Sequence, residues 1–169
     1  MQHVLILIGV SGSGKSTFAH QFLHQNPSYL RLNRDDLRRT LSGVSLREYW
    51  QWEETRKNRL ERVVTAMERA ALRSALTGGW NVVLDNTHLR RQYLEEIATL
   101  VGRTATNERP VDISFRVIDV PLETAIERDR LRPEGIGEVG IRQQWERLTY
   151  LRHQMDLNER VRFPVAQAE

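Results

Sequence analysis

The chain has 169 residues, a length that suits one domain, and 40% of them are hydrophobic, enough for one core. It carries 25 Lys and Arg against 22 Asp and Glu, and this net charge of +3 only weakly favours a polyanionic partner. The lack of cysteine excludes disulfides, thiol catalysis and cysteine-bound zinc. No run of about 18 apolar residues is present, which argues against a membrane-spanning helix.

The first motif along the chain is a phosphate-binding loop. Residues 9–16 fit the pattern G-x-x-x-x-G-K-[ST], between an apolar run that predicts a buried parallel strand and a segment that predicts a helix. Glycines let the backbone N–H groups surround the phosphates of ATP, with Lys15 near the β- and γ-phosphates and the Ser16 hydroxyl on Mg²⁺. The predicted nucleotide-binding residues of this loop are Gly9, Ser11, Gly12, Ser13, Gly14, Lys15, Ser16 and Thr17.

A second strand is predicted at residues 29–33, and acidic residues follow its end. Ligands of an open parallel sheet bind beyond the carboxyl ends of the strands, so Asp35 is expected on the same edge as the phosphate-binding loop. A carboxylate in this place is suited to accept the proton of an attacking hydroxyl. The alternative is that Asp35 and Asp36 only stabilise the start of a short helix that continues through Leu41.

After a loop, residues 47–76 predict one long amphipathic helix with an arginine-rich outer face. Three aromatic residues, Tyr49, Trp50 and Trp52, stand at its beginning. They either pack against the core or line a channel in which they stack on nucleobases. The sequence leaves both interpretations open.

A third strand is predicted at residues 80–85, and it ends in an acid. Asp85 stands where P-loop proteins carry the acid that helps to hold the Mg²⁺ shell, although it is also suited to cap the next turn. Asn86 and Thr87 extend the same edge and are predicted to contact the substrate. We interpret His88 as a surface residue.

The last third of the chain predicts a helix at residues 90–101, a strand within 111–120 and a helix at 122–131 that begins after Pro121. Arg128 and Arg132 are four residues apart and therefore share one helix face. A glycine-rich connection follows at residues 133–140, and a final helix is predicted at 141–157. This arrangement resembles the lid of small phosphotransferases, and we expect the lid of this chain at approximately residues 128–142. The alternative is a basic, exposed helix end.

The alternation of strands and helices predicts an α/β fold. We expect a single P-loop kinase domain over residues 1–169, built as a three-layer sandwich. The resemblance to small P-loop phosphotransferases implies a four-stranded parallel sheet of order 2-3-1-4, with helices on both faces and a lid. The chain has no Asn-Lys-x-Asp element for guanine recognition, which argues against a GTPase.

The chain resembles the kinase domain of bacteriophage-type 5′-hydroxyl polynucleotide kinases. The resemblance is carried by residues 8–17, 32–38, 83–87 and 117–121, together with the later arginine pair. It implies ATP-dependent phosphorylation of the 5′-hydroxyl end of DNA or RNA in nucleic-acid repair. The runner-up is a P-loop kinase of a small-molecule hydroxyl, similar to gluconate kinases or antibiotic phosphotransferases. The Asp-x-Asp-Gly-Thr motif of an accompanying 3′-phosphatase domain is missing from this sequence.

The resemblance also implies roles for individual residues. Asp35 would be the general base, Arg38 would bind the neighbouring phosphate of the acceptor, and Asp85 would order the acceptor and metal region. Arg132 would act on the β- and γ-phosphates, with Arg128 in support. The predicted catalytic residues are Lys15, Asp35 and Arg132, and the predicted metal ligands are Ser16 and Asp85. Arg128 and Arg132 are predicted to bind the nucleotide together with the residues of the phosphate-binding loop. The predicted substrate-binding residues are Arg34, Asp35, Arg38, Asp85, Asn86 and Thr87.

The expected cofactors are ATP and Mg²⁺. The expected partners are nucleic-acid 5′ ends, and no association with a membrane is expected. A nucleotide-binding loop without an export signal favours the cytoplasm. The long helix and the helix around Trp145 leave formation of a homo-oligomer open.

Overall fold

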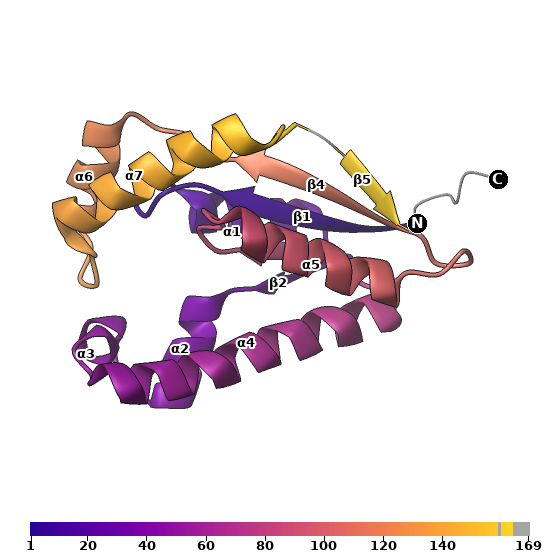
Figure 1. The fold of residues 1–169 in the computed structure, drawn as a ribbon, viewed down its shortest axis with the longest axis horizontal. Helices are drawn as coiled ribbons and strands as arrows, with labels where there is room; N and C mark the ends of the chain where they lie inside the picture. The colour runs from indigo at the N-terminus through magenta and orange to yellow at the C-terminus, as the bar shows by residue number, and fades with distance from the viewer. Residues whose placement is uncertain (159, 164–169) are drawn as a thin grey trace.

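The computed structural model describes residues 1–158 and 160–163 (Figure 1). The strands are β1 (Gln2–Ile8), β2 (Tyr29–Leu32), β3 (Asn81–Asp85), β4 (Val111–Val117) and β5 (Arg160–Phe163). The helices are α1 (Lys15–Gln25), α2 (Arg34–Ser42), α3 (Leu46–Trp50), α4 (Glu54–Thr77), α5 (Arg91–Thr104), α6 (Leu122–Arg130) and α7 (Gly137–Gln154). Within these residues, no helix combines the length and apolar character that a membrane crossing requires.

The sheet has the order β2-β3-β1-β4-β5, and its first four strands are parallel. This confirms the predicted α/β fold and the order 2-3-1-4. The structure adds β5, which runs antiparallel to β4 at the edge of the sheet and pairs Val111 with Phe163. This short strand was not predicted from the sequence.

The central strand β1 is buried on both faces, which explains its continuous apolar sequence. Val4, Ile6 and Ile8 belong to a large core cluster that includes side chains of α4, α5, α6 and α7. The alternate residues Leu5 and Leu7 pack with α1 on the other face. The carboxyl ends of β1 and β4 point toward α2, α3 and α6 (Figure 1). The fold therefore gathers the segments that follow the parallel strands at one end of the sheet.

The predicted long helix at residues 47–76 is wrong in one respect, because the structure divides it into α3 and α4. The Ser45 side chain caps α3 by accepting a hydrogen bond from the Glu48 N–H group. Tyr49 is then fully buried and its hydroxyl donates to Glu61 on α4. The turn at residues 51–53 folds α3 back against α4, and helical periodicity alone does not reveal such a turn.

The segment after α6 also differs from the prediction, since α6 ends at Arg130 and Arg132 lies beyond it rather than on one helix face with Arg128. The last helix begins at Gly137, so the connection that precedes it is shorter than the predicted range 133–140. Asp129 supports this early start, since its buried carboxylate accepts a hydrogen bond from the Gly137 N–H group at 2.8 Å. The connection is thus tied to the end of α6.

Candidate active site

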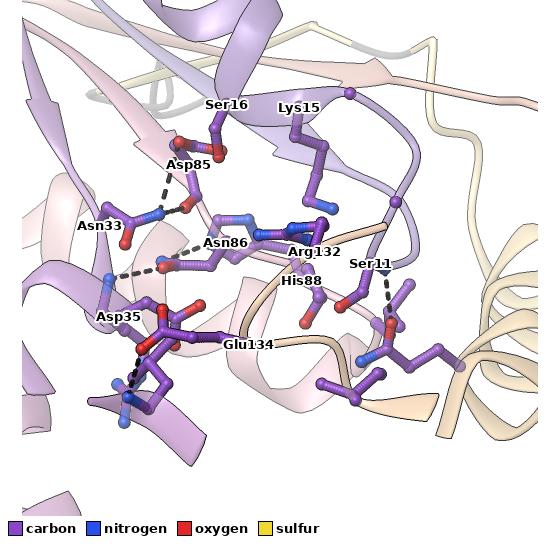
Figure 2. Close-up of a pocket in the computed structure, with 18 of the residues that line it drawn as sticks. Ser11, Lys15, Ser16, Asn33, Asp35, Asp85, Asn86, His88, Arg132 and Glu134 are labelled. Carbon is purple, nitrogen blue, oxygen red and sulfur yellow. Dashed lines mark hydrogen bonds between the residues drawn. The ribbon is translucent and has the colours of Figure 1, made fainter. Parts of the chain in front are cut away.

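A pocket of about 1060 Å³ lies at the carboxyl ends of the parallel strands. Its walls come from the phosphate-binding loop, the start of α2, the end of β3 and the segment between α6 and α7 (Figure 2). Of the residues predicted from the sequence, all except Gly9 and Ser13 line this pocket. The structure thus brings the candidate donor and acceptor residues together in one cavity.

The phosphate-binding loop takes a backbone path that requires glycine. Gly12 has a φ of +77°, and a Cβ atom at this position would lie 2.4 Å from the Ala125 carbonyl oxygen. Gly14 precedes α1 in the left-handed conformation, and no side chain caps the helix. The first N–H groups of α1 are therefore left for an anion at the positive end of the helix.

Lys15 is buried at the base of the loop (Figure 2). Its Nζ donates to the Val10 carbonyl at 2.7 Å and to Ser13 Oγ at 3.4 Å. Burial lowers the pKa of Lys15 from 10.5 to about 8, although the nearby Asp85 acts in the opposite direction. The charge of Arg132 lowers this pKa further, so these two cations face the same part of the pocket.

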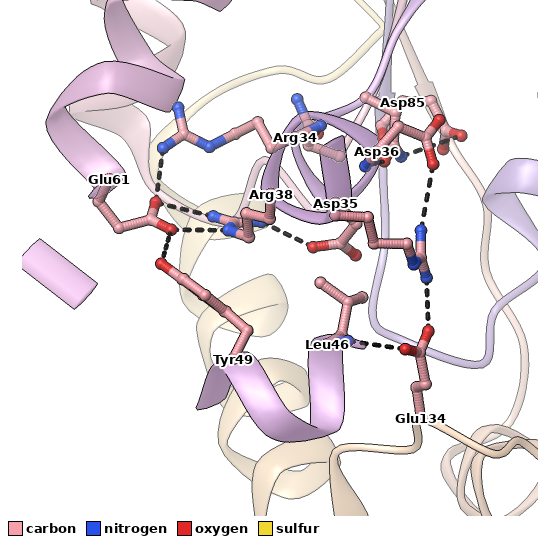
Figure 3. Close-up of polar contacts among 12 residues, drawn as sticks. Arg34, Asp35, Asp36, Arg38, Leu46, Tyr49, Glu61, Asp85 and Glu134 are labelled. Carbon is pink, nitrogen blue, oxygen red and sulfur yellow. Dashed lines mark hydrogen bonds and ion pairs between the residues drawn. The ribbon is translucent and has the colours of Figure 1, made fainter. Parts of the chain in front are cut away.

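Asp35 lies in the first turn of α2 and lines the pocket, and its side chain is 44% exposed to solvent. One of its oxygens accepts a hydrogen bond from Arg38 Nη1 at 2.7 Å. Arg38 is held on its other side by Glu61, which accepts from Nε at 2.7 Å and from Nη2 at 2.9 Å (Figure 3). Arg38 is therefore fixed between two carboxylates, one of which is the candidate base.

The sequence analysis missed Glu61 and Glu68, two acids on α4 that organise this end of the pocket. Arg34 donates to both of them, at 2.8 Å and 3.1 Å. Asn86 donates to Glu68 at 2.7 Å and accepts from the Arg34 N–H group at 2.8 Å. Arg34 and Asn86 thus tie α2, α4 and the end of β3 together. The seven-residue spacing of the two acids, which places them on one helix face, was the available signal.

Asp85 is almost fully buried, and its Oδ2 accepts from Arg31 Nε at 2.8 Å. Its other oxygen, Oδ1, is buried and has no hydrogen-bond partner among the described residues. The Ser16 hydroxyl lies on the same side of the pocket (Figure 2). A hydroxyl and an unsatisfied carboxylate oxygen are the donors that Mg²⁺ and its water shell require, so these residues fit the predicted metal site. The sequence analysis did not identify Arg31.

The prediction that His88 is a surface residue is wrong, because its side chain is only 3% exposed. Its Nδ1 donates to the Leu7 carbonyl at 2.6 Å, and its ring stacks on Tyr93 with the centroids 5.6 Å apart. Burial lowers the pKa of His88 and favours the neutral ring. His88 thus links the end of β3 to β1 beneath the pocket.

The segment between α6 and α7, the predicted lid, places cations in the pocket and contacts both of its sides. Neither Arg128 nor Arg132 forms an ion pair with a described residue, although both line the pocket. Glu134 accepts from Arg39 Nη2 and from the Leu46 N–H group, each at 2.7 Å (Figure 3). Glu134 therefore joins this segment to α2 and α3.

A second contact joins α7 to the phosphate-binding loop. The Gln144 side chain on α7 accepts a hydrogen bond from the Ser11 N–H group at 2.7 Å (Figure 2). The segment that carries Arg132 is thereby attached both to the phosphate-binding loop and, through Glu134, to the candidate acceptor side. Sequence spacing gave no signal for either contact, since both join residues about 90 or more positions apart.

The lowered pKa of Lys15 predicts a pH-dependent affinity for ATP. Bound phosphates favour the charged amine, so above pH 8 the free protein must take up a proton to bind. Affinity should be highest below pH 8 and fall by up to about tenfold per pH unit above it. Isothermal titration calorimetry between pH 7 and 10 measures this change. Lys15→Arg should remove the pH step, and a pH-independent affinity of the wild type would contradict the account.

The pKa of Glu61 predicts a contribution to acid stability. Burial raises this pKa, but hydrogen bonds from Arg38 and Tyr49 outweigh burial and lower it from 4.5 to about 2. The stabilisation is therefore complete above pH 4.5 and is lost as the pH falls toward 2. Glu61→Gln should lower the free energy of unfolding at pH 7 by about 3 kcal/mol, with a difference from wild type that shrinks below pH 4.5.

Denaturant unfolding at several pH values measures this difference. The matched control is Glu95→Gln, which removes only an exposed ion pair with Arg91 and should change stability far less. A constant difference between Glu61→Gln and wild type from pH 7 to pH 2 would show that the carboxylate charge is not the cause.

Comparison with known proteins shows which family the chain belongs to. The family model described as an AAA domain matches residues 4–152. A protein of Autographa californica nuclear polyhedrosis virus, whose name describes a bifunctional polynucleotide kinase/RNA ligase, is 31% identical over 137 residues. That match covers 79% of this chain but only 18% of the viral protein.

Solved structures also show similarity to kinases. A chain in the structure of the Pnkp1/Rnl/Hen1 RNA repair complex has a TM-score of 0.77 and 29% identity, and the match covers 99% of this chain and 50% of that one. A gluconokinase from Sinorhizobium meliloti 1021 has a TM-score of 0.51 at 17% identity, which shows a shared fold only. The chain spans half the length of the first of these structures. The resemblance to polynucleotide kinases is thus confirmed, and the chain belongs to the family that the AAA domain model describes.

Proposed function

We propose that this domain transfers the γ-phosphoryl group of ATP to the 5′-hydroxyl end of DNA or RNA, in nucleic-acid repair. The observation that carries the proposal is the pair of Asp35 and Arg38, which faces Lys15 across a single pocket. One carboxylate oxygen of Asp35 is engaged by Arg38, and the exposed part of the side chain is available to an acceptor hydroxyl. The similarity to polynucleotide kinases supports this acceptor.

The reaction is an in-line displacement at phosphorus. The 5′-oxygen forms a bond to the γ-phosphorus while the bond to the β,γ-bridging oxygen breaks, and ADP leaves. Asp35 accepts the proton of the 5′-hydroxyl, and Arg38 aligns the acceptor through its neighbouring phosphate. Lys15, Arg128 and Arg132 stabilise the charge on the transferred group. Ser16 and Asp85 would hold Mg²⁺, which neutralises charge on the β- and γ-phosphates when it is bound.

In this proposal residues 1–169 act as one kinase domain, with residues 128–142 as its lid. Nucleic-acid 5′ ends are its partners. The matched structure in an RNA repair complex favours a role beside other repair activities. Phosphorylation of a small-molecule hydroxyl is the alternative. Salt dependence separates the two, because binding of a polynucleotide weakens steeply with ionic strength and binding of a neutral sugar does not.

Replacement of the candidate base tests the proposal directly. Asp35→Asn keeps the shape of the side chain but removes the proton acceptor, so transfer from ATP to a 5′-hydroxyl oligonucleotide should fall about 10²- to 10⁴-fold. ATP binding should persist, because Asp35 lies on the acceptor side. Transfer and ATP affinity are measured on the same preparation.

The matched control is Asp36→Asn. This neighbouring carboxylate contacts Arg31 and Arg39 and does not line the pocket. Transfer by this variant should stay within a few-fold of wild type. A near-wild-type rate for Asp35→Asn, or an equal loss in both variants, would exclude Asp35 as the base.

A further inference from the structure

We propose that Trp50 is a stacking platform for a nucleobase of the acceptor strand, and specifically for a base next to the phosphate that Arg38 binds. The inference rests on the proposed function and deepens it. It adds a site for a flat aromatic group on the acceptor side of the pocket, next to Asp35, which would receive the hydroxyl, and Arg38, which would bind the phosphate.

The structure separates the three aromatic residues at the start of the helical region. Tyr49 is fully buried and its hydroxyl is engaged by Glu61. Trp52 does not line the pocket, and the Arg56 guanidinium lies 3.4 Å from the centroid of its ring. Trp50 lines the pocket and is 47% exposed. Of these three residues, Trp50 is therefore the one that offers open aromatic surface to a ligand in this cavity.

Trp50 also lies beside the groups that would hold the acceptor. The Arg38 guanidinium carbon is 5.2 Å from the centroid of the Trp50 ring, and Arg38 contacts Asp35 at 2.7 Å. The indole is thus one side chain away from the candidate base. Tyr49 packs against it at 4.9 Å between centroids and an interplanar angle of 68°, which supports the ring from the protein side.

The chemistry of a strand end matches this arrangement. The first internucleotide phosphate joins the terminal nucleotide to the next one, so a base lies on either side of it. If Arg38 binds this phosphate, one of the two bases lies within reach of a ring that Arg38 itself contacts. Every nucleobase has a π-face, so stacking selects a polynucleotide without selecting a sequence.

Kinetics with modified acceptors test the inference. The acceptors are a 5′-hydroxyl oligonucleotide and two versions with an abasic site at the first or the second position. Trp50→Ala should raise the oligonucleotide KM roughly 5- to 100-fold and leave the KM for ATP unchanged. Trp50→Phe should restore most of the affinity. The matched control, Trp80→Ala, removes a 44%-exposed tryptophan outside the pocket and should have no effect.

The loss of affinity caused by Trp50→Ala and the loss caused by removal of the stacked base should not add. One of the abasic acceptors should be used less well by the wild type, by a factor similar to that of Trp50→Ala, and the variant should show no further loss with that acceptor. An unchanged oligonucleotide KM in Trp50→Ala, or an undiminished penalty for both abasic acceptors in that variant, would overturn the inference. Circular dichroism of the variant excludes loss of folding as the cause.

A binding measurement separates this inference from the proposed function. Fluorescence anisotropy follows the labelled oligonucleotides on the wild type and on Trp50→Ala without need for transfer. If the wild type phosphorylates the oligonucleotide and Trp50→Ala binds it equally well, only the inference fails. If the wild type neither binds nor phosphorylates any oligonucleotide, the proposed function fails and the inference fails with it.

Discussion

The common direction of the first four strands determines where the residues of the candidate active site lie. Each crossover returns the chain to the amino end of the next parallel strand, so the segments after β1, β2, β3 and β4 meet at the opposite end of the sheet. These segments supply the phosphate-binding loop, the start of α2, the Asp85 region and the connection to α6. The pocket is a direct consequence of this topology. Its formation depends on β1, which is apolar on both faces because helices cover both.

Charge pairing divides the pocket into two parts, which the proposed function assigns to the acceptor and to the phosphate donor. On the acceptor side, Arg31, Arg34 and Arg38 each contact a carboxylate, and these contacts fix the geometry around Asp35 and Asp85. On the donor side, Lys15, Arg128 and Arg132 have no ion pair with any described residue. Among the described residues these cations have no carboxylate partner, and the phosphates of a nucleotide would supply the missing negative charge. The paired arginines position groups, and the unpaired ones provide charge.

The sequence predicted the fold and most of the pocket because both depend on local signals. A glycine-rich loop between a strand and a helix, acids at strand ends and an arginine pair four residues apart are all visible within short windows. Glu61, Glu134 and Gln144 were missed because they contact residues 12 to 133 positions away. His88 was placed on the surface because nothing near it in the sequence shows that Leu7 supplies its buried partner. The break between α3 and α4 depends on burial of Tyr49, which periodicity does not encode.

The central claim is that the pocket joins a nucleoside triphosphate to a strand end. The most direct measurement incubates the protein with Mg²⁺ and ATP labelled in the γ-phosphate, with one oligonucleotide that carries a free 5′-hydroxyl and another of the same sequence that carries a 5′-phosphate. The account predicts label on the first oligonucleotide and none on the second. Label on neither, with ATP binding intact, would contradict it and would direct attention to a small-molecule acceptor in the same pocket.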